Sequence, residues 1–170
     1  MDKLSFSEEK LTLLLNIKKE DIGLRRYQGV SDGFEQKSEF HLTLIGNHGG
    51  REIKNSINTF NLYYQYDAVE KIRALAYKTD WKYSLLDVVY KVSKEYNDTD
   101  KRESIIQMVE IPFLVGFYDS LNKMLKTNLR YPLEHVTLFT RGTNPERSKM
   151  GIGINSEIDF FELSPICIKV

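Results

Sequence analysis

The sequence predicts one α+β domain with a mainly antiparallel sheet and helices packed outside it. Residues 40–46 and 134–142 each alternate apolar and polar side chains, as half-buried strands do. Between these segments, apolar residues spaced at three and four indicate helices. No linker rich in Pro, Gly or Ser divides the sequence, so we expect a single domain over residues 1–170.

The composition is typical of a globular protein and excludes several classes. The chain has 170 residues, of which 41% are hydrophobic and 28% charged. Its formal net charge of +0 argues against binding to long duplex nucleic acid, which needs a strong basic excess. The single cysteine, Cys167, rules out an internal disulfide and is consistent with a reducing compartment. Because no signal-peptide core or apolar run of transmembrane length occurs, we expect a cytoplasmic monomer without a membrane contact.

The first half of the chain combines helical patterns with the first strand of the pair. A serine followed by two glutamates and a leucine stripe predicts a helix near the N-terminus. The expected elements are a helix within 5–18, an irregular stretch over 22–35, a strand over 39–45, a glycine-rich turn over 46–50, and helices over 51–60 and 61–79.

The second half predicts a β-hairpin, a helix, the second strand of the pair and two short terminal strands. The expected elements are hairpin strands over 81–92 and 103–111, a helix over 113–125 after Pro112, the strand at 134–140, and strands over 158–163 and 166–170. The polar, basic segment 141–149 is either a substrate lid or a solvated hairpin turn.

Two of the three histidines occur in the same pattern, His, apolar residue, Thr, on these two strands. His41 and Thr43 share one strand face, and His135 and Thr137 share one face of the other strand. A lone histidine on a half-buried strand is more often structural than catalytic. The recurrence of the same pattern 94 positions later favours a functional role for both histidines.

The paired motifs His41-Leu42-Thr43 and His135-Val136-Thr137 resemble the 2H phosphoesterase superfamily, whose members carry two His-x-Thr/Ser motifs. Its best-known members are RNA 2′,3′-cyclic phosphodiesterases of the LigT kind. The resemblance covers only these motifs and their spacing. It implies two similar lobes related by a pseudo-twofold axis, with the motif strands side by side in a central groove. It also implies hydrolysis of a 2′,3′-cyclic phosphate, a 2′-5′ linkage or, as in the phage anti-CBASS branch, a cyclic oligonucleotide.

The chemistry of these residue types agrees with that implication. Two histidines with ordinary pKa values near 6.5 can serve as general acid and general base at the two ends of one displacement. Threonine hydroxyls can donate to the non-bridging phosphate oxygens. We expect neither a metal nor a cofactor, because the sequence lacks the Cys and His spacings of a zinc site.

Three further residues are candidates for substrate binding, with a nucleotide or short oligonucleotide as the expected partner. Strand parity places Phe139 and Arg141 on the face of the second motif, where Arg141 would contact phosphate. Tyr27 and Phe139 are candidates for stacking on a base. The alternatives are a surface charge at a strand end for Arg141 and core packing for the aromatic rings.

Two alternative hypotheses compete with a phosphodiesterase. One is a catalytically idle module of the same fold that binds RNA ends or phosphate. The other is a structural α+β domain in which the motif pair is a coincidence. The second alternative predicts that His41 and His135 lie far apart or are fully buried.

Overall fold

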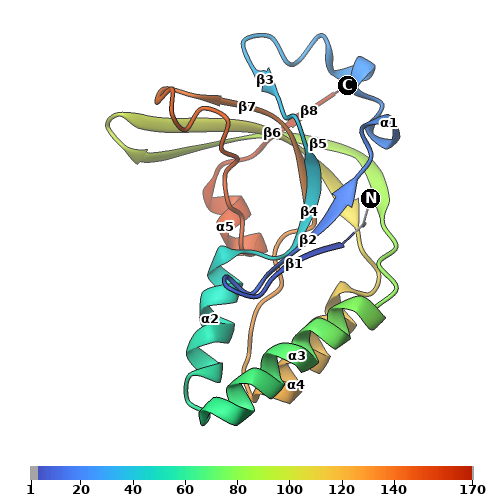
Figure 1. The fold of residues 1–170 in the computed structure, drawn as a ribbon. Coiled ribbons are helices and arrows are strands. Elements are labelled where there is room, and N and C mark those ends of the chain that lie inside the picture. Colours follow the sequence, from blue (N-terminus) through green and yellow to red (C-terminus); the bar gives the residue numbers. More distant parts are fainter. Residues whose placement is uncertain (1–3, 170) are drawn as a thin grey trace.

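A computed structural model describes residues 4–169 as an α+β fold built on one antiparallel sheet (Figure 1). The strands are β1 Leu4–Ser7, β2 Thr12–Ile17, β3 Glu35–Gln36, β4 Phe40–Ile45, β5 Ser84–Asn97, β6 Asp100–Glu110, β7 His135–Gly142 and β8 Ile166–Ile168. The helices are α1 Lys19–Ile22, the 3-10 turn η1 Leu24–Tyr27, α2 Asn47–Ile57, α3 Leu62–Lys78, α4 Leu114–Leu125 and α5 Glu157–Glu162. The predicted fold class is therefore confirmed.

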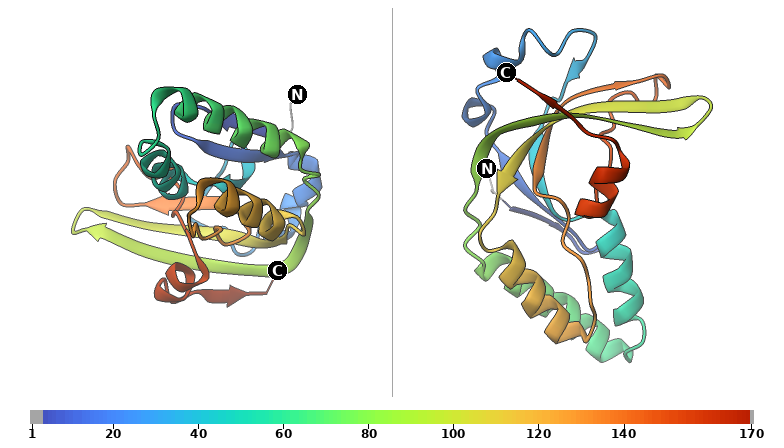
Figure 2. Two further views of the ribbon diagram at one scale, coloured as in Figure 1. Left: turned by 90° about the horizontal axis from the view of Figure 1, so that it is seen from below. Right: turned by 180° about the vertical axis from the view of Figure 1, so that it is seen from behind.

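The two motif strands are neighbours in the middle of the sheet. The strand order is β1-β2-β4-β7-β6-β5-β8, and β3 pairs with β7 beside this path. All of these pairs are antiparallel. The hairpin of β5 and β6 extends beyond the rest of the sheet, whereas α2, α3 and α4 gather at the opposite end of the molecule (Figures 1 and 2).

The two faces of the sheet carry separate hydrophobic clusters. The larger cluster joins apolar side chains of β4 and β7, including Leu42 and Val136, to buried residues of α2, α3 and α4. The smaller cluster joins Ile106 of β6 to Ile152 and Phe160 of the C-terminal segment. This segment, with α5, covers part of the face opposite the larger cluster.

Several predicted elements are confirmed, because local and tertiary preferences agree there. Helix α3 begins where the side chain of Asn61 accepts a hydrogen bond from the Tyr64 N–H at 3.1 Å, and its buried residues follow helical spacing. The predicted β5–β6 hairpin and the helix after Pro112 are also present.

The helix predicted within residues 5–18 is wrong. The segment is instead the hairpin of β1 and β2. Leu13, Leu15 and Ile17 are buried at every second position, and Leu11 adopts a positive φ of 51° at the turn. The leucine stripe thus follows the period of a strand, which the glutamates after Ser7 obscured.

The glycine-rich segment after the first motif is the start of a helix and not a turn. Helix α2 begins at Asn47, so the predicted boundary near residue 51 is four residues late. A Cβ atom at Gly50 would overlap the carbonyl oxygen of Lys10 in the β1–β2 turn. Gly50 therefore allows α2 to pack closely against the N-terminal hairpin.

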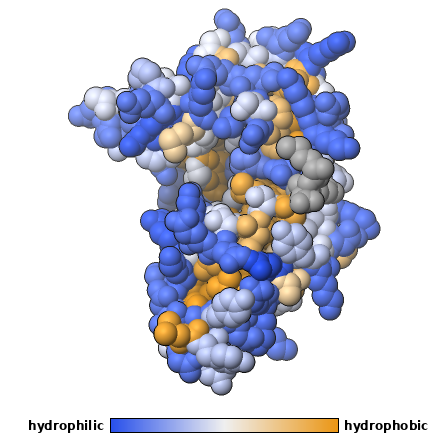
Figure 3. Space-filling model, viewed as in Figure 1, coloured by the Kyte–Doolittle hydropathy of each residue, from blue (hydrophilic) through white to orange (hydrophobic). Residues whose placement is uncertain are grey.

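The strand predicted over residues 158–163 is also wrong, because α5 occupies this segment. Ser156 caps α5 by accepting a hydrogen bond from the Asp159 N–H at 3.1 Å. The predicted last strand is present as β8, while position 170 lies outside the described residues. None of the helices within residues 4–169 is long and apolar enough to span a membrane. In the view of Figure 3 most of the surface is hydrophilic, and apolar side chains gather over the helical end.

Candidate active site

The register of β4 and β7 brings the two motifs together. Leu42 pairs with Val136, and both side chains are fully buried. In an antiparallel ladder this pair sets His41 opposite Thr137 and Thr43 opposite His135. Directly opposite Cβ atoms lie about 4.5–5.5 Å apart and diagonal ones about 7–8 Å apart, so the two imidazoles are diagonal neighbours.

These four side chains, termed the motif residues (His41, Thr43, His135 and Thr137), share one face of the sheet. All four are partly exposed, and they alternate with buried residues that face the helices. Their neighbours on the adjacent strands are Leu14 and Asn16 on β2 and Ile106 and Met108 on β6. The coincidence hypothesis predicted distant or fully buried histidines, and the structure shows neither.

The main chain fixes the orientation of His135. Its Nδ1 lies 2.8 Å from the carbonyl oxygen of Leu133. Since a carbonyl can only accept, Nδ1 carries a proton, and Nε2 is the nitrogen left for proton exchange. Burial lowers the pKa of His135; the Leu133 hydrogen bond raises it, and the nearby His41 lowers it. The mutual repulsion of the two imidazoles favours a state with at most one of them protonated.

The pKa of His41 is lowered by burial and by a lysine that the sequence analysis missed. Burial lowers the pKa of His41, the positive charge of Lys37 lowers it further, and Glu39 raises it. The Lys37 Nζ donates to the carbonyl oxygen of Lys149 at 2.9 Å. Lys37 lies just before β4 in a stretch without a motif, so only the tertiary structure reveals that its ammonium group lies near His41.

Tyr27 and Phe139 do not lie in the site, and their assignment as base-stacking residues is wrong. Tyr27 is fully buried and Phe139 is 6% exposed, and their ring centroids lie 6.0 Å apart within the larger cluster. The Tyr27 hydroxyl donates to Gln107 Oε1 at 2.9 Å. Their rings fill the core, which leaves neither one a free face for a base.

A β-bulge reverses the strand parity that placed Arg141 beside the second motif. Ile106 pairs with Thr137 but Ile105 pairs with Phe139, so β7 holds one extra residue. Arg141 therefore lies on the opposite face, where its Nε donates to Glu103 Oε2 at 2.7 Å. Its guanidinium carbon also lies 4.4 Å from the ring centroid of Phe34. The predicted phosphate contact of Arg141 is thus wrong.

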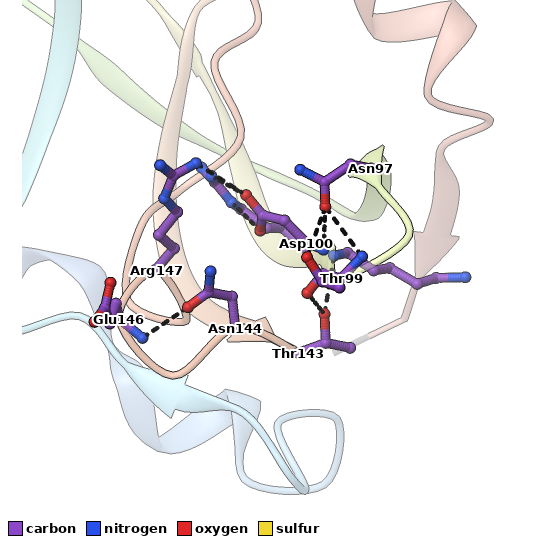
Figure 4. Close-up of polar contacts among 9 residues, drawn as sticks. Asn97, Thr99, Asp100, Thr143, Asn144, Glu146 and Arg147 are labelled. Atoms are coloured by element: carbon purple, nitrogen blue, oxygen red, sulfur yellow. Dashed lines mark hydrogen bonds and ion pairs between the residues drawn. The ribbon is translucent and has the colours of Figure 1, made fainter.

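The basic segment 141–149 is held at the tip of the β5–β6 hairpin. Thr143 donates to the carbonyl oxygen of Thr99 at 2.9 Å, and Arg147 pairs with Asp100 at 3.4 Å (Figure 4). The segment after it returns to the motif residues, because a Cβ atom at Gly151 would lie 3.4 Å from the Thr137 hydroxyl. The loop is thus an anchored turn, and the following residues form one wall beside Thr137.

Comparison of the whole chain with known proteins gave no match. Searches matched it to no protein-family model, no curated protein and no solved structure. Among residues 4–169, no three or more His, Cys, Asp or Glu side chains gather as a metal site would require. The geometry of the motif residues is therefore the observation from which a function is inferred.

Proposed function

We propose that this protein is a metal-independent phosphodiesterase that hydrolyses 2′,3′-cyclic, 2′-5′ or cyclic-oligonucleotide phosphodiesters. The observation that carries the proposal is the diagonal placement of His41 and His135 on one partly exposed sheet face, each opposite a threonine. A single phosphate above this face lies within reach of both imidazoles and both hydroxyls.

The histidines supply the proton transfers. Water attacks phosphorus while one neutral imidazole accepts its proton, and the bond from phosphorus to the ribose oxygen breaks. The other imidazole, in its protonated form, gives its proton to the departing oxygen, so a phosphomonoester and a free hydroxyl result. The proposal is supported by the hydrogen bond from His135 to the Leu133 carbonyl oxygen at 2.8 Å, which leaves Nε2 of this ring for proton exchange.

The neighbouring polar groups stabilise the charge that grows on phosphorus oxygens. Thr43 and Thr137 can each donate a hydrogen bond to a non-bridging oxygen. Lys37, whose charge already acts on His41, adds a positive field on the same side. These interactions require no metal ion.

The proposal includes a two-lobed organisation like that implied by the 2H resemblance. The Leu42–Val136 pair is the centre of a local twofold relation between the motifs, because each histidine faces the other motif's threonine. Each motif strand also lies between its partner and one flanking strand, β2 or β6. The exposed free thiol of Cys167 suits a reducing compartment, so we place the activity in the cytoplasm, on nucleotides or short oligonucleotides.

A metal-free hydrolysis panel tests this function. The substrates are 2′,3′-cyclic nucleotides, 2′-5′ oligoadenylate and 3′,5′-cyclic di- and trinucleotides, each incubated with EDTA. We expect wild type to hydrolyse at least one of them. His41→Ala and His135→Ala should each lose about 10²–10⁴-fold in kcat, the usual contribution of a general acid or base.

His48→Ala is the matched control, because the third histidine lies on α2 near Glu52. This variant should keep wild-type activity. Loss of activity in EDTA, or full activity in either motif variant, would contradict the proposal. Binding of phosphate-ended ligands without turnover would favour the idle binding module instead.

A further inference from the structure

A hollow of about 630 Å³ lies next to the second motif. Residues of β6, α4, the connector before β7 and α5 line it, and Met108, Leu133 and Glu134 are among them. Met108 is the cross-strand partner of His135, and Leu133 holds its Nδ1. The hollow therefore shares lining residues with the immediate surroundings of His135, although the His135 side chain does not itself line it.

An aromatic ring in a fixed position borders the hollow. Tyr131 is 43% exposed, and its ring meets that of Tyr118 edge-on, with centroids 6.1 Å apart. Tyr118 is itself buried, and its hydroxyl donates to the carbonyl oxygen of Leu44 at 2.9 Å. This chain of contacts positions Tyr131 relative to the strand that carries the first motif.

Apolar side chains complete the walls on the two helices. Val115 of α4 is 48% exposed and Ile158 of α5 is 57% exposed, although both are aliphatic. Partly exposed apolar groups around a concave surface of this size are typical of a pocket for a small organic ligand.

The charges around the hollow decide which part of a nucleotide it suits. Asp119, Glu134 and Glu157 are carboxylates in its lining, and Arg130 is the cation. Three carboxylates against one guanidinium disfavour a second phosphate there. The carboxylates instead favour a neutral nucleobase, whose amino groups can donate hydrogen bonds to them. Arg130 has no ion-pair partner among residues 4–169, so its guanidinium can donate hydrogen bonds to the ring nitrogens of the base.

We propose that this hollow binds the nucleobase of the substrate, with the base stacked on Tyr131 while the phosphate lies between His41 and His135. The inference rests on the proposed function and adds to it the part of the protein that would hold the base of the nucleotide substrate. The stacking role that the sequence analysis gave to Tyr27 and Phe139, whose rings are buried, is assigned here to the exposed ring of Tyr131.

Two cyclic phosphates test the subsite, one with a base and one without. We would measure kcat/KM for adenosine 2′,3′-cyclic phosphate and for glycerol 1,2-cyclic phosphate. Tyr131→Ala should lower the value for the nucleotide by about fivefold or more, as expected for loss of base stacking, and leave the base-free ester unchanged. Tyr131→Phe should retain wild-type values because it keeps the ring. Tyr77→Ala, which removes a 59% exposed tyrosine of α3, is the control and should change neither substrate.

An equal loss on both esters in Tyr131→Ala, or no loss on either, would overturn the subsite while leaving the two-histidine mechanism intact. Hydrolysis of neither ester by wild type would count against the proposed function. In that case, calorimetric titration with adenosine 2′,3′-cyclic phosphate tests base binding at the hollow independently of hydrolysis. Weaker binding to Tyr131→Ala than to wild type supports it, whereas equal affinity, or no binding to wild type, overturns it.

Discussion

At the scale of single residues, the environment of each imidazole determines what it can do. Burial and the positive charge of Lys37 disfavour the protonated form of His41. Burial and the proximity of His41 likewise disfavour the protonated form of His135. Both pKa values therefore lie below the ordinary value of 6.5. The hydrogen bond to Leu133 partly offsets this effect for His135 by stabilising the proton on Nδ1.

Removing the charge of Lys37 should raise the pKa of His41 toward its ordinary value. The variant Lys37→Gln tests this, with the ring-proton chemical shifts of the three histidines followed by NMR during a pH titration. We expect a higher midpoint for His41 than in wild type. An unchanged midpoint for His41 would show that Lys37 exerts no field at the site.

If His41 and His135 are the acid and base of the proposed reaction, the same pKa directions set its pH dependence. The base must be neutral, so kcat/KM rises with pH through the lower of the two pKa values. The acid must be protonated, so kcat/KM falls again above the higher one. Since burial lowers both, the maximum should lie below pH 6.5. A pH–rate profile of the free enzyme with a maximum above pH 7 would contradict this assignment.

At the scale of elements, strand pairing explains which expectations succeeded. The helical period of α3 and the alternation of both motif strands were evident in the sequence, because local pattern and burial agree there. The β-bulge at Leu138 was not evident in the sequence, because a bulge depends on how β7 pairs with β6. The N-terminal hairpin and α5 were also missed, because short apolar runs fit either period.

The contact between α2 and the N-terminal hairpin gives a stability prediction. Gly50→Ala forces a methyl group against the Lys10 carbonyl, so it should lower the free energy of unfolding by about 1–3 kcal/mol. Gly116→Ala is the matched control within α4, because its Cβ would meet no atom within 4 Å. That change should instead stabilise by about 0.5–1 kcal/mol, since alanine favours a helix interior. Urea denaturation measures both, and equal effects would refute the close approach at Gly50.

At the scale of the whole molecule, one sheet separates a helix-covered core from a face that carries the four motif residues. The larger cluster stabilises the side that carries Leu42 and Val136, so the motif residues on the other side are not needed as core. Composition and patterning predicted this α+β class. The sequence did not single out Lys37 or Tyr131, which lie shortly before His41 and His135, because neither stands in a recognisable motif and the position of each side chain depends on the tertiary structure.

The lowered histidine pKa values also predict acid sensitivity of the whole fold. The unfolded chain binds protons at these two sites more readily than the folded chain does. Their contribution to the free energy of unfolding is therefore complete above pH 6.5 and decreases as pH falls toward the lowered pKa values. Urea denaturation at pH 7.5 and 5.5 measures the decrease, which should be smaller in His135→Gln than in wild type. An identical decrease in wild type and His135→Gln would contradict the prediction.

The central claim is that His41 and His135 act together on one phosphate, and a double-mutant cycle tests it most directly. The measurement is kcat for hydrolysis of a 2′,3′-cyclic nucleotide in EDTA by wild type, His41→Ala, His135→Ala and the double variant. If the histidines are the acid and base of one step, the double variant should be little worse than either single variant. Losses that multiply in the double variant, or one single variant that retains wild-type kcat, would contradict the claim.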